Sequence, residues 1–222
     1  MALESQKATK LALPGAEGLE RLATLWDRHG RIVLGVAGVL VVVGGVMFLN
    51  LRTRAASEEQ ASIQLAQAAI LYWQGEYARS LEMARQIAKQ YPSAPSGIEA
   101  HRLAGDNAYW VGNFKDAVAE YRRYLDKEKR GLLANAGRRS LAYALESDHQ
   151  YLEAARLYEK LVGVFDRTSS AEFLTAAARC DRLAGRTAEA MQRLQRVDQE
   201  FGETSYAQAA RIELAELSAA KR

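Results

Sequence analysis

Aromatic and arginine side chains recur at a fixed spacing after residue 70. A Tyr-Trp pair occupies residues 72–73 and occurs again at 109–110, 37 residues later. Rigid amphipathic rings and guanidinium groups carry much of the binding energy at protein interfaces. Their recurrence therefore predicts a surface that holds an extended or helical polypeptide. The residues expected to line it are Tyr72, Trp73, Arg102, Asp106, Tyr109, Trp110, Arg139, Tyr143, Arg179 and Arg182.

The same residues have a purely structural interpretation. Trp73 and Trp110 would serve equally well as covers for the joints between packed helices. The arginines would serve equally well as an ordinary solvated helix face. Both interpretations stay open on the sequence alone.

The sequence lacks the residue patterns of an enzyme. Cys180 is the only cysteine, which leaves no disulfide within the chain and predicts a buried structural thiol. His29, His101 and His149 are far apart and lack the spacing of metal ligands. No phosphate-binding loop, dinucleotide fingerprint or nucleophile elbow occurs. We therefore expect no catalytic residue, no metal and no cofactor.

The charge balance argues against nucleic acid as the main ligand. The net charge is +3 in 222 residues, and the lysines and arginines are interspersed with acids. A nucleic-acid-binding domain usually gathers its bases on one face or along one helix.

The elements that position the candidate residues come from an internal repeat. Four segments begin at residues 75, 112, 149 and 185, so the steps between them are 37, 37 and 36 residues. Each has a glycine or histidine first, a residue that is usually aromatic two places later, a small residue three places beyond that, and a further packing position four places on. These positions hold Gly75, Tyr77, Ser80 and Ala84; Gly112, Phe114, Ala117 and Tyr121; His149, Tyr151, Ala154 and Tyr158; and Gly185, Thr187, Ala190 and Leu194.

Each position has a mechanical role in a pair of antiparallel helices. The glycine permits the positive φ of a tight turn between the two helices, and His149 is expected to adopt it in the third copy. The aromatic residue opens the second helix, and the small residue lets the two helices touch. Pro92 is expected to end the first copy, since proline cannot continue a helix.

This pattern resembles the tetratricopeptide repeat, from about residue 57 to 200. The small residue of that family's first helix is matched by Ala68, Gly105, Ala142 and Ala178, whereas Thr187 departs from its aromatic position. The resemblance implies an all-α α-solenoid over residues 57–222, with about four helix pairs and a capping helix at about 205–219. It also implies that the first helices line the concave side, where the candidate residues would lie.

A membrane anchor is predicted before the repeats. The twenty residues 32–51 contain Asn50 as their only polar side chain, and twenty helical residues cover about 30 Å, the thickness of a bilayer's apolar core. We therefore expect a transmembrane helix over 31–52. Residues 1–30 are expected to be partly disordered, with a short interfacial helix from about residue 19 that carries Trp26.

The flanking charges predict the orientation of this anchor. Five bases precede the span and two follow it before Arg79, which favours a cytoplasmic amino end and a periplasmic repeat domain. A cleavable signal peptide would have a shorter apolar core and a better cleavage site than Thr53-Arg54-Ala55. An inverted chain would instead be a cytoplasmic adaptor.

An amino-terminal span followed by tetratricopeptide repeats is similar to the YfgM family, the ancillary subunit of the SecYEG translocon. The resemblance is one of architecture and covers nearly the whole chain. It implies a scaffold of the bacterial inner membrane that works beside the translocon with a PpiD-type chaperone and assists exported polypeptides. No catalytic residues follow from it. An assembly scaffold for another envelope complex has the same plan and is the alternative.

Overall fold

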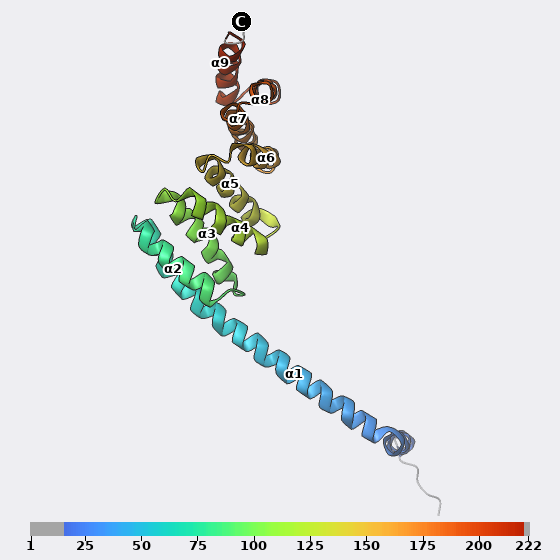
Figure 1. The fold of residues 1–222 in the computed structure, drawn as a ribbon. Helices are drawn as coiled ribbons and strands as arrows, with labels where there is room; N and C mark the ends of the chain where they lie inside the picture. The colour runs from blue at the N-terminus through green and yellow to red at the C-terminus, as the bar shows by residue number, and fades with distance from the viewer. Residues whose placement is uncertain (1–15, 220–222) are drawn as a thin grey trace, which may run out of the picture. The chain divides into compact units, whose positions relative to one another are not determined.

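The structure describes residues 16–219, and every regular secondary-structure element in them is an α-helix (Figure 1). This computed structural model divides into two compact units, Met1–Arg54 and Ala55–Arg222. Of residues 1–30, which were expected to be partly disordered, residues 1–15 lie outside the described part of the chain. The helices are α1 (Ala16–Trp73), α2 (Tyr77–Gln90), α3 (Pro95–Trp110), α4 (Phe114–Lys127), α5 (Gly131–Ser147), α6 (Tyr151–Leu161), α7 (Arg167–Leu183), α8 (Thr187–Glu200) and α9 (Ser205–Ala219).

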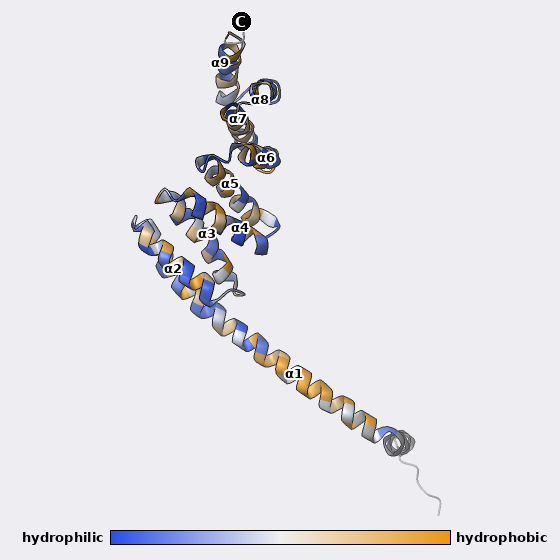
Figure 2. Ribbon diagram, in the orientation of Figure 1, coloured by the Kyte–Doolittle hydropathy of each residue, from blue (hydrophilic) through white to orange (hydrophobic). Residues whose placement is uncertain are grey.

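The first unit contains an apolar stretch of α1. Among the described residues it is the one helix long and apolar enough to cross a membrane, with a mean hydropathy of 2.3 over its best window. Figure 2 shows this stretch as a continuous run of hydrophobic colour along α1. Its side chains from Leu34 to Leu51 are all exposed. The composition therefore suits a lipid environment, where such side chains would be buried.

Helix α1 is continuous from the expected interfacial helix through the apolar span into the first repeat. It runs without interruption from Ala16 to Trp73. The reason is local, because no proline interrupts this stretch and residues 52–60 consist mostly of good helix formers. Gly30 is accommodated within the helix beside the Trp26 ring.

The second unit is a succession of helix pairs. In each pair, the first helix is residues 55–73 of α1, then α3, α5 or α7, and the second helix is α2, α4, α6 or α8. From α2 onward each helix packs on the next, and α3 also contacts α5 as α7 contacts α9. Stacking of neighbouring pairs buries one continuous core, which single pairs could not form.

The turns within the pairs have the predicted backbone. Gly75, Gly112 and Gly185 have φ of 81°, 79° and 78°. His149 has φ of 61° and is the one non-glycine residue with positive φ among the described residues. After the first turn, the Glu76 amide donates to the Leu71 carbonyl at 2.9 Å, and the other three turns repeat this bond. These bonds satisfy carbonyls at the helix ends, as in a Schellman motif.

The small positions form the contacts predicted for them. Ser80, Ala117, Ala154 and Ala190 have no exposed surface. The first helix also needs a small residue where it meets the large ring of the second. A Cβ added to Gly105 would lie 2.6 Å from the Tyr121 ring, well inside van der Waals contact.

Helix α9 covers the last repeat, as the sequence predicted. Leu214 and Leu217 pack on the core of α7 and α8, together with Ala210. Ala209 and Ile212 are also apolar residues of this helix, but both are exposed, Ile212 by 57%. Residues 210, 214 and 217 share one helical face, whereas 209 and 212 lie outside it.

Candidate functional site

The ten predicted binding residues all lie on first helices of the array. Tyr72 and Trp73 end α1, and the next four lie on α3. The remaining residues lie on α5 and α7. This common placement follows from the repeat, since the turn glycine or histidine ends each first helix at an equivalent position.

A hollow between α3 and α5 brings four of the predicted residues together. Its volume is about 140 Å³. Tyr121 of α4 and Ser140 of α5 also line the hollow, although the sequence did not predict them as binding residues. Their positions in the repeat do not show that their side chains reach this surface. The lining residues are Asp106, Tyr109, Trp110, Tyr121, Ser140 and Tyr143.

Asp106 forms the polar floor of this hollow. Its carboxylate accepts hydrogen bonds from Arg102 Nη1 at 2.6 Å and from Tyr121 Oη at 2.7 Å. Burial raises the pKa of Asp106, although the Arg102 charge opposes the rise. Burial also raises the pKa of Tyr121, so the phenol remains a hydrogen-bond donor. The Asp106 carboxylate therefore has hydrogen-bond partners within the chain, and aromatic side chains line the hollow around it.

Trp110 packs at the joint between two helix pairs and also remains partly exposed. Its ring stacks on Tyr77 with centroids 5.7 Å apart, and its indole N–H donates to Tyr72 Oη at 3.0 Å. These contacts join the first two helix pairs. The side chain still keeps 57% of its surface exposed, beside the hollow.

Trp73 is the most exposed large apolar side chain in residues 55–219. It keeps 83% of its surface exposed and makes an edge contact with Tyr72, with centroids 5.3 Å apart. An indole ring that stays exposed contributes little burial energy to folding. Its apolar surface contributes that energy to binding when a partner covers the ring. Trp73 therefore has no evident packing role.

Three of the predicted arginines bind carboxylates within the chain. Arg102 pairs with Asp106 on its own helix. Arg179 holds Glu146 through two hydrogen bonds of 2.6 and 2.9 Å, and Arg182 reaches Glu213 on α9 at 3.0 Å. Arg179 thus connects α7 to α5, and Arg182 connects α7 to α9. Because all three guanidinium groups already bind a carboxylate, fewer of their N–H groups are free to bind a ligand.

The fourth arginine, Arg139, has an aromatic partner. Its guanidinium lies 5.7 Å from the centroid of the Phe165 ring. This arrangement is a cation–π contact. Arg139 is exposed, and the contact directs it toward the loop after α6 instead of toward the hollow of Asp106.

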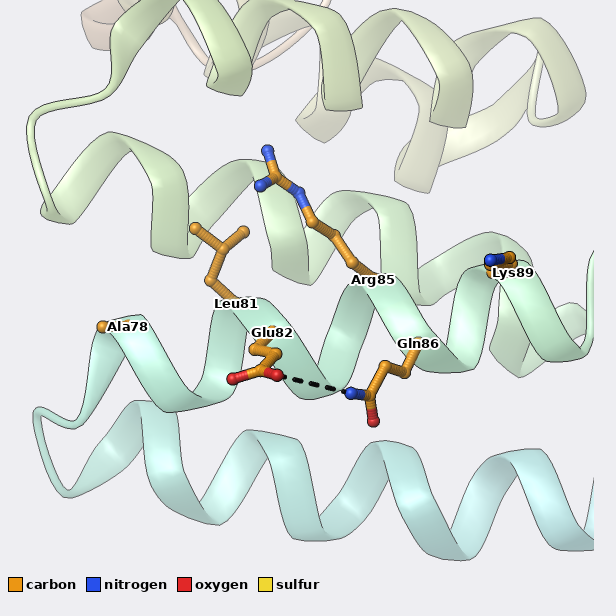
Figure 3. Close-up of a pocket in the computed structure, with 6 residues that line it drawn as sticks. All are labelled: Ala78, Leu81, Glu82, Arg85, Gln86 and Lys89. Carbon is orange, nitrogen blue, oxygen red and sulfur yellow. Dashed lines mark hydrogen bonds between the residues drawn. The ribbon is translucent and has the colours of Figure 1, made fainter.

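A second surface, on the second helices, was missed by sequence reasoning. One open hollow of about 390 Å³ lies along α2 and is lined by Ala78, Leu81, Glu82, Arg85, Gln86 and Lys89. Figure 3 shows Leu81 and Arg85 on the same side of α2, with Gln86 bonded to Glu82.

The neighbouring hollow, of about 370 Å³, lies between α2 and α4. Its centre is Glu120, whose side chain is almost wholly buried and whose carboxylate is held by Arg85, His101 and Arg123. Hydrogen bonds and charge from His101 and Arg123 lower the pKa of Glu120 against its burial. The sequence did contain one indication of this hollow. Arg85 and Lys89 have i, i+4 spacing on one helix face, and Asp116 and Glu120 have the same spacing on another, so the two faces carry opposite charges.

The described residues contain no cluster of three or more side chains able to hold a metal ion. Cys180 is buried, and burial raises the pKa of its thiol to about 12. A thiol with that pKa is protonated and unreactive near neutral pH.

Comparison with known proteins identifies the fold. No family model matches the sequence, and no curated protein matches it. Among solved structures, it is similar to the nearly identical TPR-like repeats of a Podosopora anserina protein described as a putative kinesin light chain, with a TM-score of 0.58 and 20% identity over 74% of this chain and 88% of that chain. A form of that protein with one substitution gives a TM-score of 0.58 at 20% identity, over 74% and 87% of the two chains.

At this identity the likeness concerns the fold alone. The chain has the all-α, tetratricopeptide-like repeat fold that its sequence predicted. Arrays of this kind present extended surfaces on which other polypeptides bind.

Proposed function

We propose that this chain is a membrane-tethered scaffold that binds protein partners or exported polypeptides on the first-helix face of its repeat array. The observation that carries the proposal is the exposure of Trp73, 83%, on a repeat fold that has no other evident use for it. Trp110 and the hollow floored by Asp106 extend the same aromatic surface. The apolar part of α1 supplies the tether.

Tethering changes how strong each contact must be. A scaffold confined to a membrane meets partners of the same membrane at a high effective concentration, so weak individual contacts suffice. A shallow surface with a few aromatic anchors matches this requirement better than a deep pocket does. The modest volume of the α3–α5 hollow, about 140 Å³, is consistent with one or two side chains of a partner.

The location and partners in this proposal rest on the charge asymmetry and the architecture. The five bases before the span favour a cytoplasmic amino end, with the array in the periplasm of a bacterial inner membrane. The resemblance to the YfgM family suggests the Sec translocon and a PpiD-type chaperone as neighbours. A scaffold for another envelope complex would use the same surface on different proteins.

Photo-crosslinking in the native membrane tests the binding surface. A photoreactive amino acid is placed at Trp73 or, as the control, at Gln86 on the second-helix face of α2. We expect crosslinks to polypeptides at residue 73 and few at residue 86, and identification of the products distinguishes translocon components from other envelope proteins. Equal crosslinking at both positions would refute a first-helix binding surface.

A reporter fused after Arg222 tests the orientation separately. Activity of a reporter that works only in the periplasm supports the proposed topology. Activity of a cytoplasmic reporter would overturn it and favour the adaptor that faces the cytoplasm. The binding surface is unaffected by this outcome, so the two parts of the proposal fail independently.

A further inference from the structure

One edge of the array carries a row of exposed bases. Each of the helices α2, α4 and α6 has a lysine in its last turn, namely Lys89, Lys127 and Lys160. All three are exposed, and none forms a salt bridge with a carboxylate of the described residues. Lysine suits a helix C-terminus, because it offsets the negative end of the dipole. We call this side, where second helices end and the next first helices begin, the connector edge.

The connection between α4 and α5 adds two exposed leucines to this edge. Leu132 is 74% exposed and Leu133 60% exposed. Among the large apolar side chains of residues 55–219, only Trp73 is more exposed than Leu132. They lie in the first turn of α5, whose core-facing positions are taken by Ala134 and Gly137. Gly131, with φ of 89°, begins the helix just before them. The leucines are therefore left on a face that no part of residues 16–219 covers.

Bases precede these leucines directly. Lys127, Lys129 and Arg130 are exposed, and Asp126 and Glu128 offset two of the three charges. The nearby Arg138 binds the Asn135 side chain and the carbonyl of residue 129, so its charge meets no carboxylate. A protruding apolar pair next to exposed bases is the arrangement that binds an anionic lipid surface.

The connector edge is also where the chain enters the array after its apolar stretch. Glu58 accepts hydrogen bonds from the Ser96 amide at 3.0 Å and from Ser96 Oγ at 2.6 Å. Gln60 accepts from Tyr91 Oη at 3.3 Å. Ser96 and Tyr91 lie at the α2–α3 connection, so the residues that follow the tether pack on this edge and not on the edge of the glycine turns.

We propose that the connector edge is a second membrane contact, in which Leu132 and Leu133 enter the headgroup layer of an anionic bilayer. Lys127, Lys129 and Arg130 contact the lipid phosphates there. The occupant is a lipid surface because the leucines protrude, line none of the hollows described above, and lie next to exposed bases that match anionic headgroups. This contact would fix how the array stands on the membrane. It does not depend on the first-helix face binding a protein.

Fluorescence of the full chain in proteoliposomes tests this contact. An environment-sensitive dye is attached to Leu132→Cys in a Cys180→Ala background, in bilayers of phosphatidylcholine with or without phosphatidylglycerol. The matched control is Leu183→Cys, which is 46% exposed and lies beside a glycine turn, on the opposite edge. We expect a blue shift and roughly twofold stronger quenching by headgroup-labelled nitroxide lipid at residue 132 in the anionic bilayer, and little at residue 183.

Charge variants and a second label make the result decisive. Lys129→Glu with Arg130→Glu should abolish the excess quenching at residue 132, with unchanged circular dichroism. A dye at Glu128→Cys keeps both leucines in place and should report the same difference between lipids. Equal signals at residues 132 and 183, or insensitivity to the charge variants, would overturn the proposal. A blue shift in detergent without lipid that grows with protein concentration would do so too, since it would indicate contact between copies.

Discussion

Near the turns within the helix pairs, an aromatic joint connects the first two pairs, whereas an ionic joint connects the third and fourth. In the first, Trp110 stacks on Tyr77 and donates to Tyr72. In the second, Glu146 occupies the position equivalent to Tyr72, two repeats on, and is held by Arg179 through two hydrogen bonds. The Tyr158 hydroxyl donates to the same carboxylate at 2.8 Å.

This difference shows which positions set the geometry of the array. The turn residues and the buried small residues are alike in both regions, so the backbones approach in the same way. Contacts at the exposed ends of the first helices can then be aromatic or ionic without changing the stack. The aromatic joint leaves rings available to a partner, and the ionic joint uses up its own charges. Binding is therefore expected at the amino-terminal end of the array.

The largest effect is expected from Gly105→Ala, in the aromatic region. The new methyl would lie 2.6 Å from the Tyr121 ring, and relief requires a shift of α3 against α4. We expect a loss of about 1–3 kcal/mol in the free energy of unfolding, measured by urea denaturation of the full chain in detergent. The reverse change at the equivalent position of the next repeat, Ala142→Gly, introduces no clash. It should lower the free energy of unfolding by about 1 kcal/mol. Equal stability of wild type and Gly105→Ala would mean that Tyr121 moves freely.

Trp110→Ala should come next and separates joint from surface. It removes the stack on Tyr77 and the hydrogen bond to Tyr72, so we expect a loss of about 1–2 kcal/mol. Trp73→Ala, by contrast, should change stability by less than about 0.5 kcal/mol, because the side chain is almost free of contacts. Both variants should reduce the amount of partner protein that co-purifies with the chain from the native membrane. A large loss of stability with Trp73→Ala would indicate a packing role instead.

Glu146→Gln tests the ionic joint and should cost about 1 kcal/mol at low salt. The neutral amide loses the charge-assisted bonds to Arg179, whose guanidinium is 45% exposed and can turn to water. Because the attraction is screened, the cost should shrink as salt rises. The cost of Trp110→Ala should be insensitive to salt under the same conditions. A salt-independent loss in Glu146→Gln would contradict the ionic account.

The smallest effect at neutral pH concerns Cys180. Burial raises the pKa of its thiol from 9.0 to about 12, so between these values the folded chain keeps a proton that the unfolded chain has lost. The contribution to stability is thus complete below about pH 9 and falls as pH rises toward 12. The stability difference between wild type and Cys180→Ala should narrow over this range. Folded protein should also resist thiol reagents near pH 8, and ready labelling would contradict burial.

Particular residues explain how much could be predicted from the sequence. The repeat pattern that begins at Gly75 predicted the helix pairs, their turns and the positive φ of His149. Each of these features depends on local backbone preference. The sequence could not decide between packing and binding for Trp110, since its spacing does not show that the ring stacks on Tyr77 and still stays 57% exposed. It also missed Glu120, whose three hydrogen-bond partners, Arg85, His101 and Arg123, come from three different helices.

The sequence by itself determined the repeat, the all-helical fold and a segment apolar enough for a bilayer. Those properties follow from the spacing and polarity of side chains along the chain, which act over a few residues. Only the tertiary structure decided that Arg179 and Arg182 bind Glu146 and Glu213, while Trp73 stays open to solvent. Pairing between helices depends on which side chains the stack brings within hydrogen-bonding distance. That distance is set by the packing of whole helices and cannot be read from spacing along one of them.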